Sequence, residues 1–273
     1  CGFVGYGMLD AAVAGDIFTS PTPDQVLAAI EAVDSGMGVL LVIKNYTGDV
    51  MNFEMAAELA EAKGISVEQV IVNDDIAVED STYTVGRRGI VGTVFVHKIA
   101  GAAAEAGWPL AEVKRVAEKG IRNVASMGVA LSPCVSPITG QPSFELADGE
   151  IELGVGIHGE PGIERTDMLP ANDLVDVLFA RIHAEKKLQA GTKVAVILNG
   201  LGGTPVSELY VCYRRLAQVL AELGVQIHGA LVGEYMTALD MSGFSMSILE
   251  LDDELTQLLD APTLAPSWDL RAV

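Results

Sequence analysis

Short apolar runs rich in Val, Ile and Leu alternate with helix-forming segments along most of this 273-residue chain. Gly38 to Ile43 and Val67 to Val72 have the composition of strands, and Met51 to Lys63 between them has helix formers throughout. Gly64 follows directly and is a suitable C-cap. A strand, a helix and a strand in this order form a βαβ unit with a right-handed crossover. The alternation therefore predicts an α/β fold.

Further helices are expected on both sides of this unit. Upstream, Thr22 is a candidate N-cap for a helix with Pro23 at its first position. Downstream, the segments from Gly89 to Gly107 and from Pro109 to Arg122 are predicted to be helical. Within the helix of the βαβ unit, four apolar residues lie near one face, as is typical of an amphipathic helix: Phe53, Met55, Ala56 and Leu59.

The character of the sequence changes after these helices, and we place a domain boundary near residue 124. A Pro- and Ser-rich turn from Ser132 to Pro142 and a helix from Val206 to Leu223 separate strand-like runs. The expected strands are Val129 to Leu131, Ile151 to Ile157, Lys193 to Leu198, Val225 to Val232 and Phe244 to Leu249. The sequence thus predicts two α/β domains, residues 1–124 and 125–273, each with a mainly parallel or mixed sheet flanked by helices.

The charge balance excludes several classes of partner. The chain has 37 acidic and 17 basic residues and a net charge of −20, so its field repels phosphate backbones and anionic membrane surfaces. Neither a nucleic acid nor a membrane surface is therefore expected as a partner. A membrane span is not expected either, because every apolar stretch is broken well before ~18 residues. The three cysteines are too scattered for a disulfide framework or a metal-ligand pair, which indicates a reduced, cytoplasmic protein.

Lys44 and Asp49 follow a buried strand and lie where a helix opens. Ligands of open α/β sheets bind beyond the carboxyl ends of strands, so both side chains are aimed at a probable pocket. There a lysine donates to a substrate oxygen, and a carboxylate accepts a hydroxyl proton. A structural interpretation competes with this one, because Asp49 also suits a helix N-cap and Lys44 a surface position at a strand end. Spacing alone favours that alternative.

His158 lies in the Gly-rich segment from Gly154 to Gly162. The flanking glycines leave its ring approachable, so an imidazole here is a candidate base, nucleophile or metal ligand. The alternative is a turn histidine that merely caps a strand. No second His, Cys or carboxylate lies at zinc spacing, which argues against a metal site. The remaining histidines fit helical or strand patterns, where a structural role is usual: His97, His183 and His228.

Three other segments have weaker functional interpretations. Asn199 to Pro205 joins a strand to a helix and resembles a phosphate-binding loop, but it matches neither the dinucleotide nor the P-loop pattern. A tight turn capped by Thr204 or Ser207 explains it equally well. Asn73 to Asp75 and the pair Arg87-Arg88 are predicted to be solvated surface, with a partner-docking surface as the alternative.

Six segments, taken in order, resemble the substrate-binding K subunit of dihydroxyacetone kinases, over essentially the whole chain. The segments are Gly15 to Asp24, Ile43 to Asp49, Tyr83 to Gly89, Gly154 to Gly162, Leu201 to Tyr210 and Leu239 to Phe244. The resemblance implies that His158 bonds through Nε2 to the carbonyl carbon of a short ketose such as dihydroxyacetone, as a hemiaminal. It also implies that Lys44 and Asp49 hydrogen-bond the bound triose and that Asp49 accepts the proton of the hydroxyl that is phosphorylated.

The resemblance further implies how the reaction is divided between subunits. A covalent anchor selects ketones over glycerol and fixes the hydroxyl for transfer. Phosphoryl transfer needs mainly positioning and charge stabilisation, so ADP or ATP and Mg²⁺ are expected on a separate L subunit and no cofactor on this chain. A homodimer is expected as well. The family has a His-Glu-Pro loop upstream of the position of Cys1, so the chain is expected to be incomplete at its start.

Two alternatives remain open at this stage. Some relatives of the K subunit bind the ketose and act on a transcription regulator instead of passing phosphate, so a non-catalytic coactivator is the main alternative. A nucleotide-binding protein that uses Asn199 to Pro205 is the third interpretation, and it predicts binding of ATP or GTP to the isolated chain.

Overall fold

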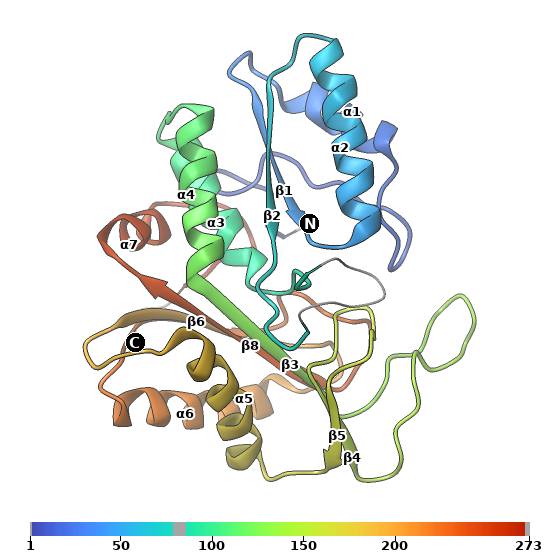
Figure 1. Ribbon diagram of the computed structural model, residues 1–273, viewed down its shortest axis with the longest axis vertical. Helices are drawn as coiled ribbons and strands as arrows, with labels where there is room; N and C mark the ends of the chain where they lie inside the picture. Colours follow the sequence, from blue (N-terminus) through green and yellow to red (C-terminus); the bar gives the residue numbers. More distant parts are fainter. Residues whose placement is uncertain (1, 79–85, 271–273) are drawn as a thin grey trace.

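The computed structural model describes residues 2–78 and 86–270 (Figure 1). The helices are α1 Pro23–Val33, α2 Thr47–Ala62, α3 Thr93–Glu105, α4 Leu110–Asn123, α5 Ala171–Lys186, α6 Val206–Glu222 and α7 Asp253–Asp260. The strands are β1 Val39–Lys44, β2 Val67–Val72, β3 Val124–Ala130, β4 Glu150–Leu153, β5 Glu164–Asp167, β6 Lys193–Gly200, β7 Gln226–Gly233 and β8 Gly243–Leu251.

The strands form two sheets, which confirms the predicted α/β class. β1 and β2 pair in parallel as a two-stranded sheet, and α2 connects them, as the βαβ pattern predicted. The second sheet is six-stranded with the order β5-β4-β3-β8-β6-β7. It is mixed, because β6 pairs with β7 in parallel and with β8 antiparallel.

Helices cover both faces of the six-stranded sheet (Figure 1). In β6, Val194, Val196 and Leu198 pack with α5 and α6, whereas the intervening Ala195 and Ile197 pack with α3, α4 and α7. Successive side chains of a strand point to opposite faces, so a strand with apolar residues at every position can be buried on both sides. The continuous apolar run of β6 therefore contributes to the hydrophobic cores on both faces of the six-stranded sheet.

Helices α3 and α4 also cover the two-stranded sheet. Val70 and Val72 of β2 belong to the same hydrophobic cluster as α3, α4 and one face of the large sheet. On the other side of β1, Leu41 and Ile43 pack with α1 and α2. One helical layer is thus shared by both sheets. The division near residue 124 stays a prediction.

Most boundaries of the first half agree with the sequence. Thr22 is the N-cap of α1 and Pro23 its first residue, and Gly64 follows the end of α2 with a φ of +85°. Helix α2 begins at Thr47, earlier than predicted. The expected apolar face was partly wrong, because Met55 and Leu59 are 51% and 44% exposed. Small Ala side chains occupy the buried positions instead and allow the helix to approach β1 closely.

The second half shows larger differences. The predicted strand from Ile151 to Ile157 ends at Leu153, because Gly154 has a φ of +77° and turns the chain out of the sheet. The predicted helix from Gly89 begins only at Thr93. β5, α5 and α7 were given no bounds in the sequence analysis, and their sequences are more polar than the neighbouring strands.

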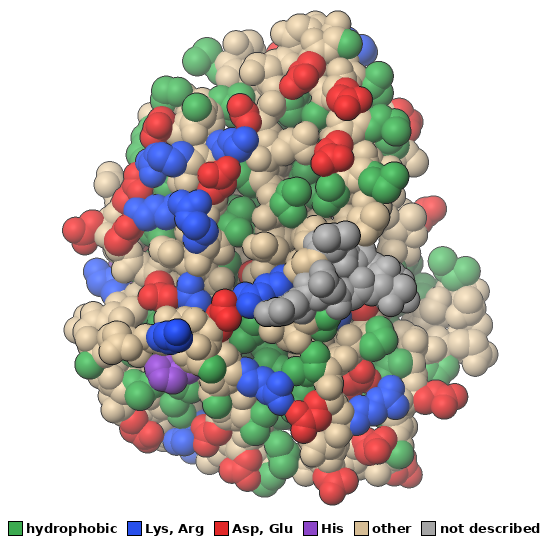
Figure 2. Space-filling view, viewed as in Figure 1, with side chains coloured by type: hydrophobic (Ala, Val, Ile, Leu, Met, Phe, Trp, Pro, Cys, Tyr) green, Lys and Arg blue, Asp and Glu red, His purple; other side chains and the backbone are tan. Residues whose placement is uncertain are grey.

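Lys and Arg side chains gather over α4 in Figure 2. These cations are paired with carboxylates, since Lys114 contacts Glu68 and Arg115 contacts Glu254 at 2.6 Å. Lys119 also contacts Glu254. The surface over α4 therefore carries both positive and negative side chains. No helix within residues 2–78 and 86–270 is long and apolar enough to cross a membrane.

Candidate functional site

Lys44 is the last residue of β1, and Asp49 lies in the first turn of α2. Tyr46 occupies the N-cap position of this helix, so the interpretation of Asp49 as the N-cap was wrong. Both side chains are half-buried rather than at an open surface. The strand end and the helix start together bring an ammonium and a carboxylate within electrostatic reach of each other.

The two charges interact with each other and with their surroundings. Burial lowers the pKa of Lys44, and the negative charges of Asp49 and Asp74 partly offset this effect. Burial raises the pKa of Asp49, although a hydrogen bond from Ser20 and the charges of Lys44 and His158 act in the opposite direction. A carboxylate with a raised pKa is a stronger base than an exposed one, which suits acceptance of a hydroxyl proton.

His158 lies in the loop from Gly154 to Gly162, which connects the antiparallel strands β4 and β5 at the edge of the large sheet. The loop folds back on itself, because the backbone N–H of Gly156 donates to the carbonyl of Glu160 at 3.0 Å. The side chain of His158 is 31% exposed, so the ring is approachable. The loop brings His158 within electrostatic reach of Asp49.

Three side chains hold the His158 ring. Nδ1 lies 2.7 Å from Oε1 of Glu160, and the backbone N–H of His158 donates to Oε2 of the same carboxylate at 2.9 Å. Phe18 and Tyr46 meet the ring edge-on, with centroid distances of 5.0 Å and 4.9 Å. The structure therefore brings all three predicted residues, Lys44, Asp49 and His158, into one region.

Arg88 ties the His158 loop to the first half of the chain. It is fully buried and forms an ion pair with Asp75 at 2.7 Å. Its Nη2 donates to the carbonyl of Gly154 at 2.6 Å and its Nη1 to that of Pro161 at 3.3 Å, so one guanidinium holds both ends of the loop. The prediction of a solvated or docking surface was therefore wrong for Asp74, Asp75 and Arg88, which are at most 2% exposed.

Replacement of Arg88 by Met is expected to lower the free energy of unfolding by about 3–5 kcal/mol, because a buried Asp75 charge and two carbonyls lose their partner. Urea unfolding measures this change. The matched control is Arg181→Met, which removes an exposed ion pair with Glu164 and is expected to cost less than about 1 kcal/mol. Equal midpoints for the two variants would contradict the structural role of Arg88.

Asn199 to Pro205 covers the end of β6 and the tight turn that leads to α6. The Asn199 side chain is buried, accepts the backbone N–H groups of Tyr235 and Met236 and donates to Ser245. Thr204 bonds to the backbone of Gly243 instead of capping α6, so the predicted capping by Thr204 was wrong. These contacts explain the conformation of the turn without a bound phosphate.

The other histidines have structural environments, although His97 lies within electrostatic reach of Lys44. His97 is buried, which lowers its pKa to about 3, and His183 stacks on Phe179 with a centroid distance of 5.7 Å. His228 pairs with Asp260 at 2.7 Å. Across the described ranges, no group of three or more His, Cys, Asp or Glu side chains is arranged to hold a metal ion.

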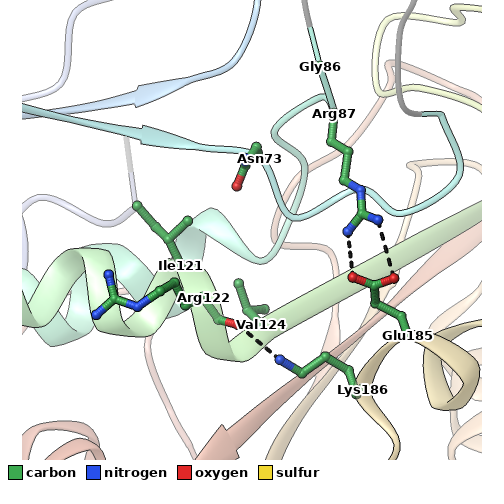
Figure 3. Close-up of a pocket in the computed structure, with 8 residues that line it drawn as sticks. All are labelled: Asn73, Gly86, Arg87, Ile121, Arg122, Val124, Glu185 and Lys186. Atoms are coloured by element: carbon green, nitrogen blue, oxygen red, sulfur yellow. Dashed lines mark hydrogen bonds and ion pairs between the residues drawn. The ribbon is translucent and has the colours of Figure 1, made fainter.

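A cavity of about 420 Å³ lies elsewhere, between the end of α4 and the end of α5 (Figure 3). Its charged groups are used within the protein, since Arg87 binds Glu185 at 2.8 Å and Lys186 donates to the carbonyl of Arg122 at 3.0 Å. None of Lys44, Asp49 and His158 lines it. This cavity is therefore separate from the candidate site.

Glu160, Arg88, Tyr46 and Phe18 were not identified from the sequence as site residues. Glu160 lies two residues after His158 in the sequence, but spacing alone does not show that its carboxylate reaches the ring. Part of the segment Tyr83 to Gly89, one of the six that carry the family resemblance, lies outside the described residues.

The Dak1 domain family matches residues 1–267 of the chain. The chain belongs to the Dak1 family. This Dak1 chain is 58% identical over 268 residues to a Listeria innocua protein named "PTS-dependent dihydroxyacetone kinase 1, dihydroxyacetone-binding subunit DhaK", covering 98% of this chain and 82% of that protein. The predicted resemblance to the K subunits is thus confirmed.

Solved structures agree with this assignment to the Dak1 family. The dihydroxyacetone kinase of C. freundii superposes with a TM-score of 0.90 at 41% identity, covering 98% of this chain and 48% of that one. A dihydroxyacetone kinase operon co-activator, Dha-DhaQ, superposes with a TM-score of 0.93 at 35% identity, covering 98% of this chain and 83% of that one. The Dak1 fold therefore occurs both in a kinase and in a co-activator.

Proposed function

We propose that this chain is the substrate-binding subunit of a dihydroxyacetone kinase, which transfers a phosphoryl group to an alcohol. The observation that carries the proposal is the His158 ring, which is approachable, is held by Glu160 through Nδ1 and lies within electrostatic reach of Asp49. Such an imidazole is suited to nucleophilic attack through Nε2. The names of the Listeria innocua and C. freundii relatives support the same reaction.

In this proposal Nε2 of His158 attacks the ketose carbonyl carbon, and the carbonyl oxygen takes up a proton to give a hemiaminal. Lys44 donates a hydrogen bond to a substrate oxygen, as its ammonium allows. Asp49 accepts the proton of the terminal hydroxyl as that oxygen attacks phosphorus. The covalent bond fixes this hydroxyl for in-line transfer, which lowers the entropic part of the barrier.

We place the nucleotide and Mg²⁺ on a partner L subunit. The C. freundii kinase, which was also solved in complex with AMP-PNP and Mg²⁺, is about twice as long as the part that this chain matches. Phosphoryl transfer depends on positioning and charge, so the phosphoryl donor and the acceptor can reside on different subunits. We further propose a homodimer located in the cytoplasm.

The second candidate is a non-catalytic ketose sensor. The similarity to the Dha-DhaQ co-activator favours it, because the high TM-score extends over nearly the whole chain. Lys44 and Asp49 favour the kinase, since a sensor needs no base at the transferred hydroxyl. Turnover of dihydroxyacetone by the full-length protein mixed with an L subunit and either ATP or a phosphoenolpyruvate-linked donor supports the kinase. Binding without turnover for every pairing supports the sensor.

Native mass spectrometry with dihydroxyacetone and with glycerol tests the covalent step. We expect the protein to gain the mass of one triose with dihydroxyacetone and nothing with glycerol, because glycerol offers no carbonyl carbon to Nε2. Glycerol is a polyol and dihydroxyacetone a hydroxyketone of the same chain length, so the two differ mainly in the carbonyl group. Equal retention of the two would contradict covalent capture and leave only noncovalent binding.

A further inference from the structure

The carboxylate of Glu160 makes two contacts with the same residue, and these contacts are of different kinds. Oε2 accepts the backbone N–H of His158 at 2.9 Å, while Oε1 lies 2.7 Å from the ring nitrogen Nδ1. An ionised carboxylate only accepts hydrogen bonds, so beside it Nδ1 carries the hydrogen. In the uncharged ring, the lone pair then resides on Nε2.

We propose that Glu160 is a positioning residue that selects the Nδ1–H tautomer of His158 and thereby makes Nε2 the nucleophile. This inference rests on the proposed function, because it assigns a role in capture of the carbonyl carbon. It deepens that function by naming the group that determines which nitrogen attacks. Glu160 itself does not touch the substrate.

Glu160 is held firmly enough for this role. Its side chain is 8% exposed, and a Cβ atom at Gly156 would lie 2.1 Å from its Oε2, so only glycine at position 156 leaves room for the carboxylate. Burial alone would raise the pKa of Glu160, but the hydrogen bonds and charge of His158 outweigh burial and lower it. The backbone N–H of His158 donates to this carboxylate whatever the charge of the ring and so favours its ionised form, which acts only as an acceptor.

The surrounding rings and charges complete the arrangement. Phe18 and Tyr46 contact the imidazole edge-on, which restricts rotation of the ring about the Cβ–Cγ bond of His158. Arg88 holds both ends of the loop, at Gly154 and Pro161. With Nδ1 held by Glu160, Nε2 lies on the far side of the ring from the carboxylate.

Glu160 also balances the charge of the capture step. As the bond from Nε2 to carbon forms, the π electrons of the carbonyl move to its oxygen and the ring becomes an imidazolium. The Nδ1 proton stays in its hydrogen bond to Glu160, while the new oxygen takes one proton from solvent. The product is a hemiaminal whose imidazolium is paired with the Glu160 carboxylate, so one proton is taken up overall. A carboxylate on the distal nitrogen stabilises the developing imidazolium in the same manner in hydrolytic triads.

Glu160→Gln is the decisive variant, because glutamine has one acceptor oxygen where the carboxylate has two. If that oxygen keeps the bond to the backbone N–H of His158, the amide NH₂ faces Nδ1 and forces the hydrogen onto Nε2. We expect the rate of triose capture to fall by at least tenfold and by up to about 10⁴-fold, as kcat does for a wrong histidine tautomer in a triad. Native mass spectrometry with dihydroxyacetone measures capture.

The matched control is Glu152→Gln. Glu152 is buried, accepts the backbone N–H of Gly162 at 2.7 Å at the end of the same loop, and makes no contact with His158 among the described residues. A general loosening of the loop would lower capture in both variants. We expect capture within about threefold of wild type for Glu152→Gln, since its carbonyl oxygen can keep that bond. Equal losses in the two variants would overturn the specific role of Glu160.

The tautomer can be read without any ketose, by ¹⁵N NMR of the histidine side chains. We expect the His158 signal to show a protonated Nδ1 in wild type and a protonated Nε2 in Glu160→Gln. A protonated Nε2 in uncharged wild-type His158 overturns the inference even if Glu160→Gln does not fold. Failure of wild type to capture dihydroxyacetone, with the expected tautomer present, would instead overturn the proposed function alone.

Discussion

His158→Ala is expected to abolish covalent capture of dihydroxyacetone while the protein remains folded. The side chain lies in a loop at the edge of the large sheet and is 31% exposed, so its removal opens no cavity in the hydrophobic cores described above. The variant has no nucleophile to form the bond to the carbonyl carbon. Mass spectrometry after incubation with the ketose should show unmodified protein only, and circular dichroism should match wild type.

His228→Ala is the matched control for this experiment. Like His158, His228 has a ring nitrogen 2.7 Å from a carboxylate, that of Asp260, but it lies on β7 and away from Lys44 and Asp49. We expect His228→Ala to capture triose as wild type does. A triose adduct on His158→Ala would show that another residue forms the bond, and the proposed chemistry would fail.

Asp49→Asn is expected to keep ketose binding and to slow phosphoryl transfer by roughly 10²–10⁴-fold, the usual contribution of a general base. An amide retains the shape of the side chain and one acceptor oxygen, but it cannot accept the proton of the attacking hydroxyl. Steady-state turnover with the L subunit present, together with the mass of the triose adduct, separates the two effects.

A control is needed because Asp49 also lies in the first turn of a helix, where a negative charge is favourable. Asp173 occupies the same position in α5, third from the helix start, and is exposed. Asp173→Asn should cost only a few tenths of a kcal/mol up to about 1 kcal/mol in stability and leave turnover unchanged. Unchanged turnover in Asp49→Asn would remove the general base from the proposed mechanism.

The strands and the position of Lys44 and Asp49 could be predicted because they depend on local sequence. β1 and β2 are short apolar runs with helix formers between them, and residues directly after such a strand reach the ligand-binding edge of an α/β sheet. The family resemblance, rather than any local pattern, distinguished His158 from a turn histidine. The proposal that His158 forms the covalent bond thus required more than residue spacing.

Arg88 and Glu160 could not be predicted in the same way. A charged residue is seldom buried without a partner, so Arg87-Arg88 suggested surface, and the partners of Arg88 at Asp75 and Gly154 lie 13 and 66 residues away along the chain. Glu160 follows His158 closely, but its carboxylate reaches the ring only because the glycine-rich turn reverses the chain. Both roles depend on tertiary geometry.

The helical layer shared by the two sheets limits how this molecule can admit its ligand. Side chains of α3 and α4 interlock with β2 on one side and with β6 and β8 on the other, so a hinge-like swing of one half against the other would break a continuous apolar core. We therefore expect the two halves to behave as a rigid block. Entry and release of a ketose then depend on small displacements of the short segments that bear Phe18 and His158.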